Sequence, residues 1–118
     1  MASQNYRDLR VWQKAVDFVC DIYKETRTFP ADERFGLISQ MRRCAVSIPS
    51  NIAEGQGRAS APEFIRFLRI AYGSLRELET QLIISQRLGF ISEKLSQELM
   101  ADAATIGKLL NGLIRSKQ

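Results

Sequence analysis

Apolar residues recur every three or four positions along four segments of this chain, and that spacing strongly limits the possible folds. It matches the 3.6-residue turn of an α-helix and places the apolar side chains of each segment on one face. The expected helices cover residues of about 9–28, 33–54, 61–88 and 92–115. No segment shows a competing β pattern. Because short turns join the helices, the sequence predicts an all-α, antiparallel up-down four-helix bundle that occupies residues 1–118 as a single domain.

Turn-forming residues separate these segments. Asp32 is expected to cap the second helix, whose apolar seam begins at Phe35. The glycine-rich stretch 55–58 predicts a left-handed cap at the end of that helix. Ser60 and Ser92 are expected to cap the third and fourth helices, and Gly89, which follows the third, is expected to end it.

Pro49 lies inside the second predicted helix. A proline there removes one backbone hydrogen bond and costs roughly 3 kcal/mol, so the sequence predicts a kink or a break near Pro49. The residues around it are polar: Ser47, Ser50, Asn51 and Glu54. We predict a structural polar network, in which Ser and Asn satisfy freed carbonyls and Glu54 pairs with an arginine of a neighbouring helix or subunit. The alternative is a ligand-binding surface.

The first helix has an unusually wide apolar face, covering an arc of about 200°. A surface helix needs only about 100°, so this helix should bury more than one side, against another helix or another subunit. We therefore predict an oligomer. The residues of the arc are Leu9, Val11, Trp12, Ala15, Val16, Phe18, Val19, Cys20, Ile22 and Tyr23.

The composition is that of a globular protein, with 45% hydrophobic and 25% charged residues. No run approaches the roughly 18 apolar residues of a membrane helix, and no apolar segment resembles a secretory signal. These features predict a soluble, cytoplasmic protein without a membrane partner. Cys20 and Cys44 lie in apolar-periodic segments and are expected to be reduced core residues.

The chain has no histidine, which removes the commonest general base and the commonest metal ligand. We therefore expect no catalysis, no cofactor and no metal. Asp17, Asp21 and Glu25 follow one another at four-residue spacing and could indicate a cation site. Basic residues such as Lys14 share that surface, so a solvated helix face is the favoured interpretation.

The charge balance is basic, with 17 Lys and Arg against 13 Asp and Glu, and 12 of the 17 are arginine. Arginine suits bidentate phosphate contacts, although it also forms ordinary solvated helix faces. On the third helix, Arg66, Arg69, Arg76 and Arg87 share a strip about 80° wide. Pairing with the flanking Glu63 and Glu77 would make that strip an ordinary salt-bridged face. The candidate nucleic-acid-binding residues are Arg42, Arg43, Arg58, Arg66, Arg69 and Arg76.

Five sequence blocks carry a resemblance to a known family. They are LRVWQKA at 9–15, FGL at 35–37, SQMRR at 39–43, AVSIPSNIAEG at 45–55 and LGFI at 88–91. With these blocks the chain resembles, from Arg7 to Leu113, the four-helix bundle proteins encoded in 23S rRNA intervening sequences.

That family is similar to the accessory variability protein of diversity-generating retroelements, a basic bundle that forms a five-membered ring and works with a reverse transcriptase and nucleic acid. The resemblance implies a homopentamer, RNA or DNA as a partner, and a protein partner such as a reverse transcriptase. We therefore predict a non-catalytic homo-oligomeric bundle that binds RNA or DNA through its basic surface. The alternative is a protein–protein adaptor or structural assembly protein with no nucleic-acid role.

Overall fold

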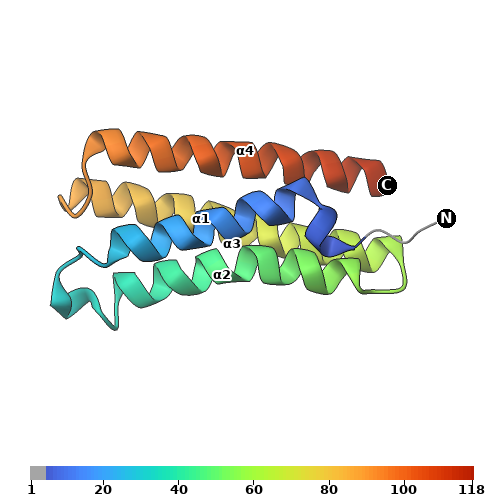
Figure 1. The fold of residues 1–118 in the computed structure, drawn as a ribbon, viewed down its shortest axis with the longest axis horizontal. Helices are drawn as coiled ribbons and strands as arrows, with labels where there is room; N and C mark the ends of the chain where they lie inside the picture. The colour runs from blue at the N-terminus through green and yellow to red at the C-terminus, as the bar shows by residue number, and fades with distance from the viewer. Residues whose placement is uncertain (1–4) are drawn as a thin grey trace.

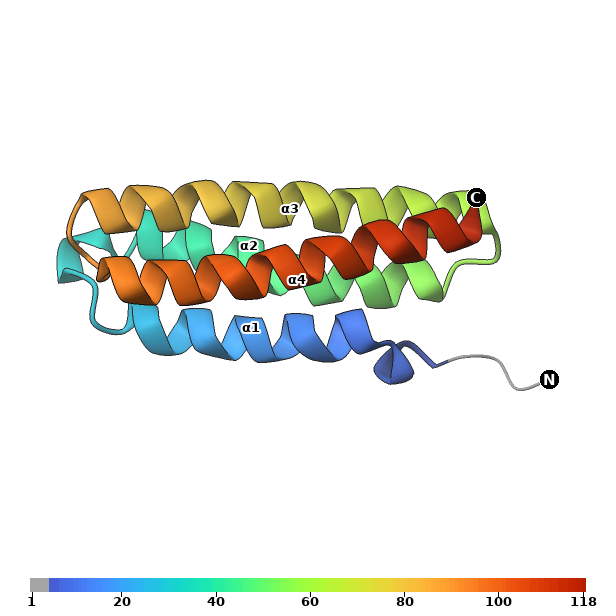
Figure 2. The same cartoon turned by 90° about the horizontal axis from the view of Figure 1, so that it is seen from above.

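A computed structural model describes residues 5–118, and in it four long α-helices run antiparallel to their neighbours (Figure 1). The helices are α1 (Arg10–Thr26), α2 (Leu37–Gln56), α3 (Ala61–Arg87) and α4 (Glu93–Lys117). Figure 2 shows α1 and α3 on opposite sides of the bundle, separated by α2 and α4. The elongated molecule measures 49 × 25 × 19 Å. The predicted all-α up-down bundle is confirmed.

One continuous core runs along the bundle and is built from the apolar seams of all four helices. Its side chains follow three- and four-residue spacing, as the sequence pattern predicts. The largest fully buried hydrophobic side chains are Phe18, Ile22, Met41, Ile48, Ile52, Leu68, Leu75, Leu78, Leu82, Ile106 and Leu110. No helix in residues 5–118 is long and apolar enough to cross a membrane.

The start of α2 differs from the prediction. The helix begins at Leu37 rather than near residue 33, because residues 31–33 form a short 3-10 turn. Asp32 does not cap it. Instead, the Oε1 atom of Glu33 accepts a hydrogen bond from the backbone N–H of Leu37 at 3.1 Å. A carboxylate at this position satisfies one of the N–H groups that the first helical turn leaves free.

The two predicted serine caps are confirmed: the hydroxyls of Ser60 and Ser92 accept hydrogen bonds from N–H groups three residues later. Gly89 ends α3 as expected, with a left-handed φ of +79°. The left-handed cap predicted after α2 is wrong. Gly57 keeps a right-handed conformation, with φ of −77°, and donates its N–H to the carbonyl of Ala53 at 3.2 Å.

Pro49 does not interrupt α2, which runs unbroken from Leu37 to Gln56. The kink or break predicted there is not seen (Figure 1). Pro49 is buried, and the isoleucines Ile48 and Ile52 beside it are fully buried. Packing on the neighbouring helices therefore holds this segment in helical form despite one missing backbone hydrogen bond.

The wide apolar face of α1 is only partly covered within one chain. Its inward side, centred on Phe18, is buried in the core. Val16 and Val19 are half-buried, whereas Cys20 and Tyr23 are exposed. The prediction that Cys20 is a core residue is therefore wrong, because no helix of the described chain covers that side of α1.

We expect Gly55→Ala to destabilise the fold. A Cβ at Gly55 would lie 2.6 Å from the Cβ of Phe67 and 3.3 Å from the carbonyl oxygen of Phe64, and neither atom can move by side-chain rotation. The free energy of unfolding should fall by about 1–3 kcal/mol, as for an overpacked site. Urea unfolding followed by circular dichroism would measure it.

Gly57→Ala provides a matched control. A Cβ at Gly57 would approach no described atom closer than 3.5 Å, so the free energy of unfolding should stay the same or rise by up to about 1 kcal/mol. Equal destabilisation by the two substitutions would show that contact with α3 is not what requires glycine at position 55.

Candidate nucleic-acid interface

Three of the six predicted arginines are engaged with carboxylates. Arg66 pairs with Glu63, which supports the salt-bridged interpretation at that position, and the hydrogen bond from Arg66 lowers the pKa of Glu63. Arg69 forms no ion pair within residues 5–118. The three N–O pairs are Arg58–Glu54 at 2.8 Å, Arg66–Glu63 at 3.1 Å and Arg76–Glu79 at 3.0 Å.

The same three guanidinium groups also lie over aromatic rings. Arg58 and Arg66 lie 4.8 and 4.6 Å from the ring centroid of Phe67, and Arg76 lies 4.9 Å from that of Tyr72. These contacts hold the groups against the bundle surface. The predicted arginine strip on α3 is therefore basic, but the carboxylates of Glu63 and Glu79 largely balance the charges of Arg66 and Arg76.

The predicted polar network forms in part. The hydroxyls of Ser47 and Ser74 lie 2.9 Å apart and join α2 to α3. The Nδ2 atom of Asn51 donates to the carbonyl of Ser47 at 2.8 Å and to its hydroxyl at 2.9 Å. Ser50 is exposed and does not join this group. Glu54 pairs with Arg58, just beyond the end of its own helix, rather than with a neighbouring helix.

A second basic surface lies between α1, the α1–α2 turn and α2, and its residues line a groove of about 500 Å³. Three guanidinium groups and two aromatic rings contribute to it, and none of the lining residues carries a carboxylate. We call it the α1–α2 groove. Its lining residues are Tyr23, Arg34, Phe35, Ile38, Ser39, Arg42, Arg43 and Val46.

Arg42 is the fixed group of the α1–α2 groove. Its Nε atom donates to the hydroxyl of Thr26 at 2.9 Å, and its Nη2 atom donates to the carbonyl of Tyr23 at 3.2 Å. Its guanidinium also lies 4.6 Å from the centroid of the Tyr23 ring. Thr26 is itself buried and bonded to the carbonyl of Ile22, so the positive charge of Arg42 is held in place.

Arg34, Phe35 and Arg43 are exposed at the edge of the groove. Phe35 was expected in the core seam of the second helix, but it precedes the helix and 88% of it is exposed. The guanidinium of Arg34 lies 5.5 Å from its ring centroid. Neither Arg34 nor Arg43 forms an ion pair with a described residue. Tyr23, Arg34 and Phe35 were not predicted to belong to a candidate site, although an aromatic residue beside arginine in a turn was a usable signal.

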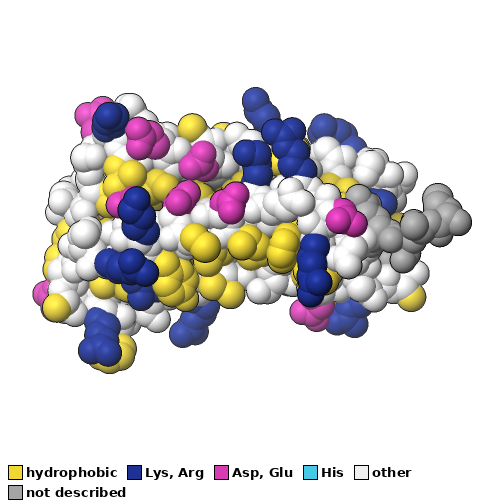
Figure 3. Space-filling model, in the orientation of Figure 1, with side chains coloured by type: hydrophobic (Ala, Val, Ile, Leu, Met, Phe, Trp, Pro, Cys, Tyr) yellow, Lys and Arg dark blue, Asp and Glu magenta, His cyan; other side chains and the backbone are white. Residues whose placement is uncertain are grey.

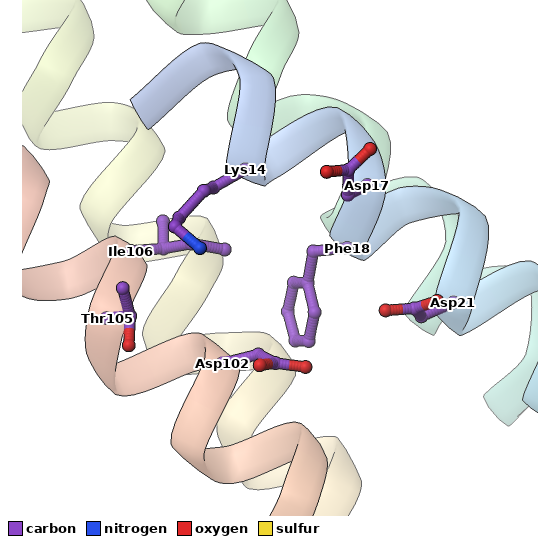
Figure 4. Close-up of a pocket in the computed structure, with 7 residues that line it drawn as sticks. All are labelled: Lys14, Asp17, Phe18, Asp21, Asp102, Thr105 and Ile106. Atoms are coloured by element: carbon purple, nitrogen blue, oxygen red, sulfur yellow. The ribbon is translucent and has the colours of Figure 1, made fainter. Parts of the chain in front are cut away.

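Acidic residues gather in a separate pocket of about 170 Å³, between α1 and α4 (Figure 4). Asp21 and Asp102 point toward one another from the two helices, with Asp17 and Lys14 nearby. Partial burial, then the charges of Asp102 and Asp17, raise the pKa of Asp21. No group of three or more potential ligands in residues 5–118 is arranged to hold a metal ion.

Comparison with known proteins identifies the family. The sequence matches the 23S rRNA-intervening sequence proteins over residues 7–112. The chain belongs to this family. A crystal structure of an S23 ribosomal protein family member of unknown function, from Bacteroides thetaiotaomicron, is 29% identical and has a TM-score of 0.79. The similarity covers 88% of this chain and 97% of that one. A search of curated proteins finds no match.

We expect Asp21→Asn to stabilise the fold near pH 7. Because the pKa of Asp21 is raised in the folded state, ionisation is harder there than in the unfolded chain. Protonated Asp21 therefore favours the folded state over the unfolded chain. This contribution is complete below the ordinary pKa of 3.8 and is lost as pH rises through the raised pKa of the folded state. Asparagine does not ionise, so the substitution should avoid this loss and raise the free energy of unfolding near pH 7 by up to about 0.5 kcal/mol.

Urea unfolding at several pH values would measure this change. Asp32→Asn, outside the pocket, is the control and should leave the pH profile as it is. A lower stability of Asp21→Asn at pH 7 would contradict the cost that burial and the neighbouring carboxylates impose on ionised Asp21.

Proposed function

We propose that this protein is a non-catalytic homo-oligomeric bundle that binds RNA or DNA through phosphate contacts. The observation that carries the proposal is the α1–α2 groove, where Arg34, Arg42 and Arg43 face no carboxylate among the lining residues. A guanidinium presents a planar fork of donors that matches phosphate oxygens. Arg69 and Arg87 on α3 also form no ion pairs among the described residues.

Assembly would strengthen such binding. The resemblance to the accessory variability protein supports a five-membered ring, and five copies of a chain at +4 would carry +20. Several weak phosphate sites on one assembly act together, because each bound site raises the effective concentration of the others. Attraction of this kind falls steeply with salt.

The uncovered side of α1 supports the oligomer. Figure 3 shows hydrophobic side chains in a row over α1 and α2, with lysine and arginine side chains at its left-hand end. On α1, Val16 and Val19 are half-buried and Cys20 is exposed. Burying such a row against another copy would remove it from water.

A protein–protein adaptor is the second candidate. The observation that favours it is a group of exposed apolar side chains on α3 and at its end, namely Ile70, Ile83, Ile84 and Leu88. A partner protein, such as a reverse transcriptase in the related retroelement systems, could cover them. In that case the basic charge would be incidental.

We predict that affinity for nucleic acid falls with salt and depends on the groove arginines. The double substitution Arg34→Gln and Arg43→Gln should weaken binding to all sequences alike, because phosphate contacts carry no sequence information. The slope of log affinity against log salt should flatten by roughly one unit for each phosphate that the variant no longer neutralises. Fluorescence anisotropy with RNA, single-stranded DNA and duplex DNA at several salt concentrations would test this.

The matched variant replaces Arg66, Arg69 and Arg76 by glutamine. Because Arg66 and Arg76 already pair with carboxylates, this triple change should flatten the slope less than the groove double change. Helicity and oligomer size should be nearly unchanged for both. Weak binding by the unsubstituted protein, unaffected by either variant, would contradict the nucleic-acid proposal and favour the adaptor.

We predict an oligomer in solution at micromolar concentration, a pentamer by resemblance. Val16→Glu should convert it to a folded monomer, since a charge placed in an apolar contact between subunits is left without a partner. Gln97→Glu, an added charge on exposed α4, is the control and should leave assembly intact. Light scattering coupled to size-exclusion chromatography would measure the mass; a monomeric unsubstituted protein would contradict assembly.

A further inference from the structure

Phe35 is the most exposed large hydrophobic side chain among the described residues, at 88% against 58% for the next, Leu88. It stands in the turn before α2, at the edge of the α1–α2 groove. The ring is not part of the core cluster, so its position contributes little to folding. A large aromatic side chain held in water beside basic residues is typical of a recognition site.

The turn keeps the Phe35 ring away from the core. Glu33 accepts a hydrogen bond from the N–H of Leu37, and this cap spans the residues between them. A Cβ at Gly36 would lie 3.0 Å from the capping Oε1 atom, so glycine lets the cap close tightly. The cap also engages the carboxylate of Glu33 at the helix end, and Glu33 does not line the groove.

Aromatic rings and guanidinium groups are paired along the groove. Arg34 lies over the ring of Phe35, and Arg42 lies over the ring of Tyr23. Arg43 is exposed and lines the same groove. A nucleotide presents a flat base and a charged phosphate, and the groove offers a flat side chain for the first and positive charges for the second.

We propose that the α1–α2 groove binds an unpaired stretch of nucleic acid, with a base stacked on Phe35 and the flanking phosphates on Arg34 and Arg43. The inference rests on the proposed function and adds to it the strandedness of the ligand. A duplex hides the faces of its bases within the stack, whereas an unpaired strand exposes them to aromatic side chains. The groove, at about 500 Å³, has the volume of a small-ligand site.

The charges of the groove favour this ligand over a two-fold contact between copies of the chain. In a two-fold symmetric contact the same patch meets itself, which would place the arginines of one copy against those of the other. An acidic peptide would satisfy the arginines, but it would leave the exposed face of Phe35 without a matching flat group. An unpaired strand satisfies both features.

The experiment compares single-stranded RNA, single-stranded DNA of the same sequence and the corresponding duplex, with the oligomeric full-length protein. Phe35→Ala should weaken binding of the unpaired strands by roughly 5- to 150-fold, the value of one stacked base, and leave duplex binding unchanged. Its salt slope should match that of the unsubstituted protein, because the ring carries no charge. Phe35→Trp should restore the affinity.

Ile70→Ala is the control, an exposed apolar residue on α3 outside the groove, and it should change nothing. The RNA and DNA arms decide which strand is preferred. If the unsubstituted protein binds no nucleic acid, the proposed function itself fails. If it binds but Phe35→Ala has no effect, or weakens duplex and single strands equally, only the inference about unpaired bases is overturned.

Two further results would overturn the inference. A change in oligomer mass on Phe35→Ala would make the groove a contact between copies of the chain. If a polyglutamate peptide competes with nucleic acid, and Phe35→Ala also weakens binding of that peptide, the groove is a site for acidic protein segments.

Discussion

The close approach of α2 and α3 at Gly55 determines how the rest of the bundle is arranged. There is no room for a Cβ between the α2 backbone and Phe67, so the two helices lie at a separation that only glycine permits. Further along the same contact, the hydroxyls of Ser47 and Ser74 meet across the helices. This pairing fixes the rotation of α2, which turns Arg42 toward α1 and leaves Arg43 exposed. The α1–α2 groove therefore depends on the contact that another side of α2 makes with α3.

The helices could be predicted from the sequence because burial repeats with the helical period, and the serine caps because they depend on bonds between residues three positions apart. The start of α2 could not. Phe35 and Ile38 have the spacing of a helical seam, and only the hydrogen bond between Glu33 and Leu37 shows that the helix begins after Phe35. Gly57 was misassigned for a similar reason, since glycine permits a left-handed conformation without requiring one.

The candidate site was harder to predict because its contacts cross between elements. Helical spacing made the pairing of Arg66 with Glu63 foreseeable. It could not show that Arg42 reaches Thr26, which lies sixteen residues earlier on another helix. Periodicity also gives the width of the apolar face of α1 without saying what covers it, and this is why Cys20 was placed in the core although it is exposed.

The distribution of charge around α1 matters more for binding than the small net charge of +4. One side of α1 supplies Asp17 and Asp21 to the acidic pocket with α4, and another supplies Tyr23 to the basic groove with α2. At physiological salt, charges are screened over about 8 Å, so the potential at the groove is set mainly by the groups nearest to it. An anionic strand at the groove therefore experiences mainly the local arginines, whereas a strand that approaches the acidic pocket is repelled. This separation of acidic from basic side chains orients a polyanion on the bundle, even though the positive and negative charges of the chain nearly cancel.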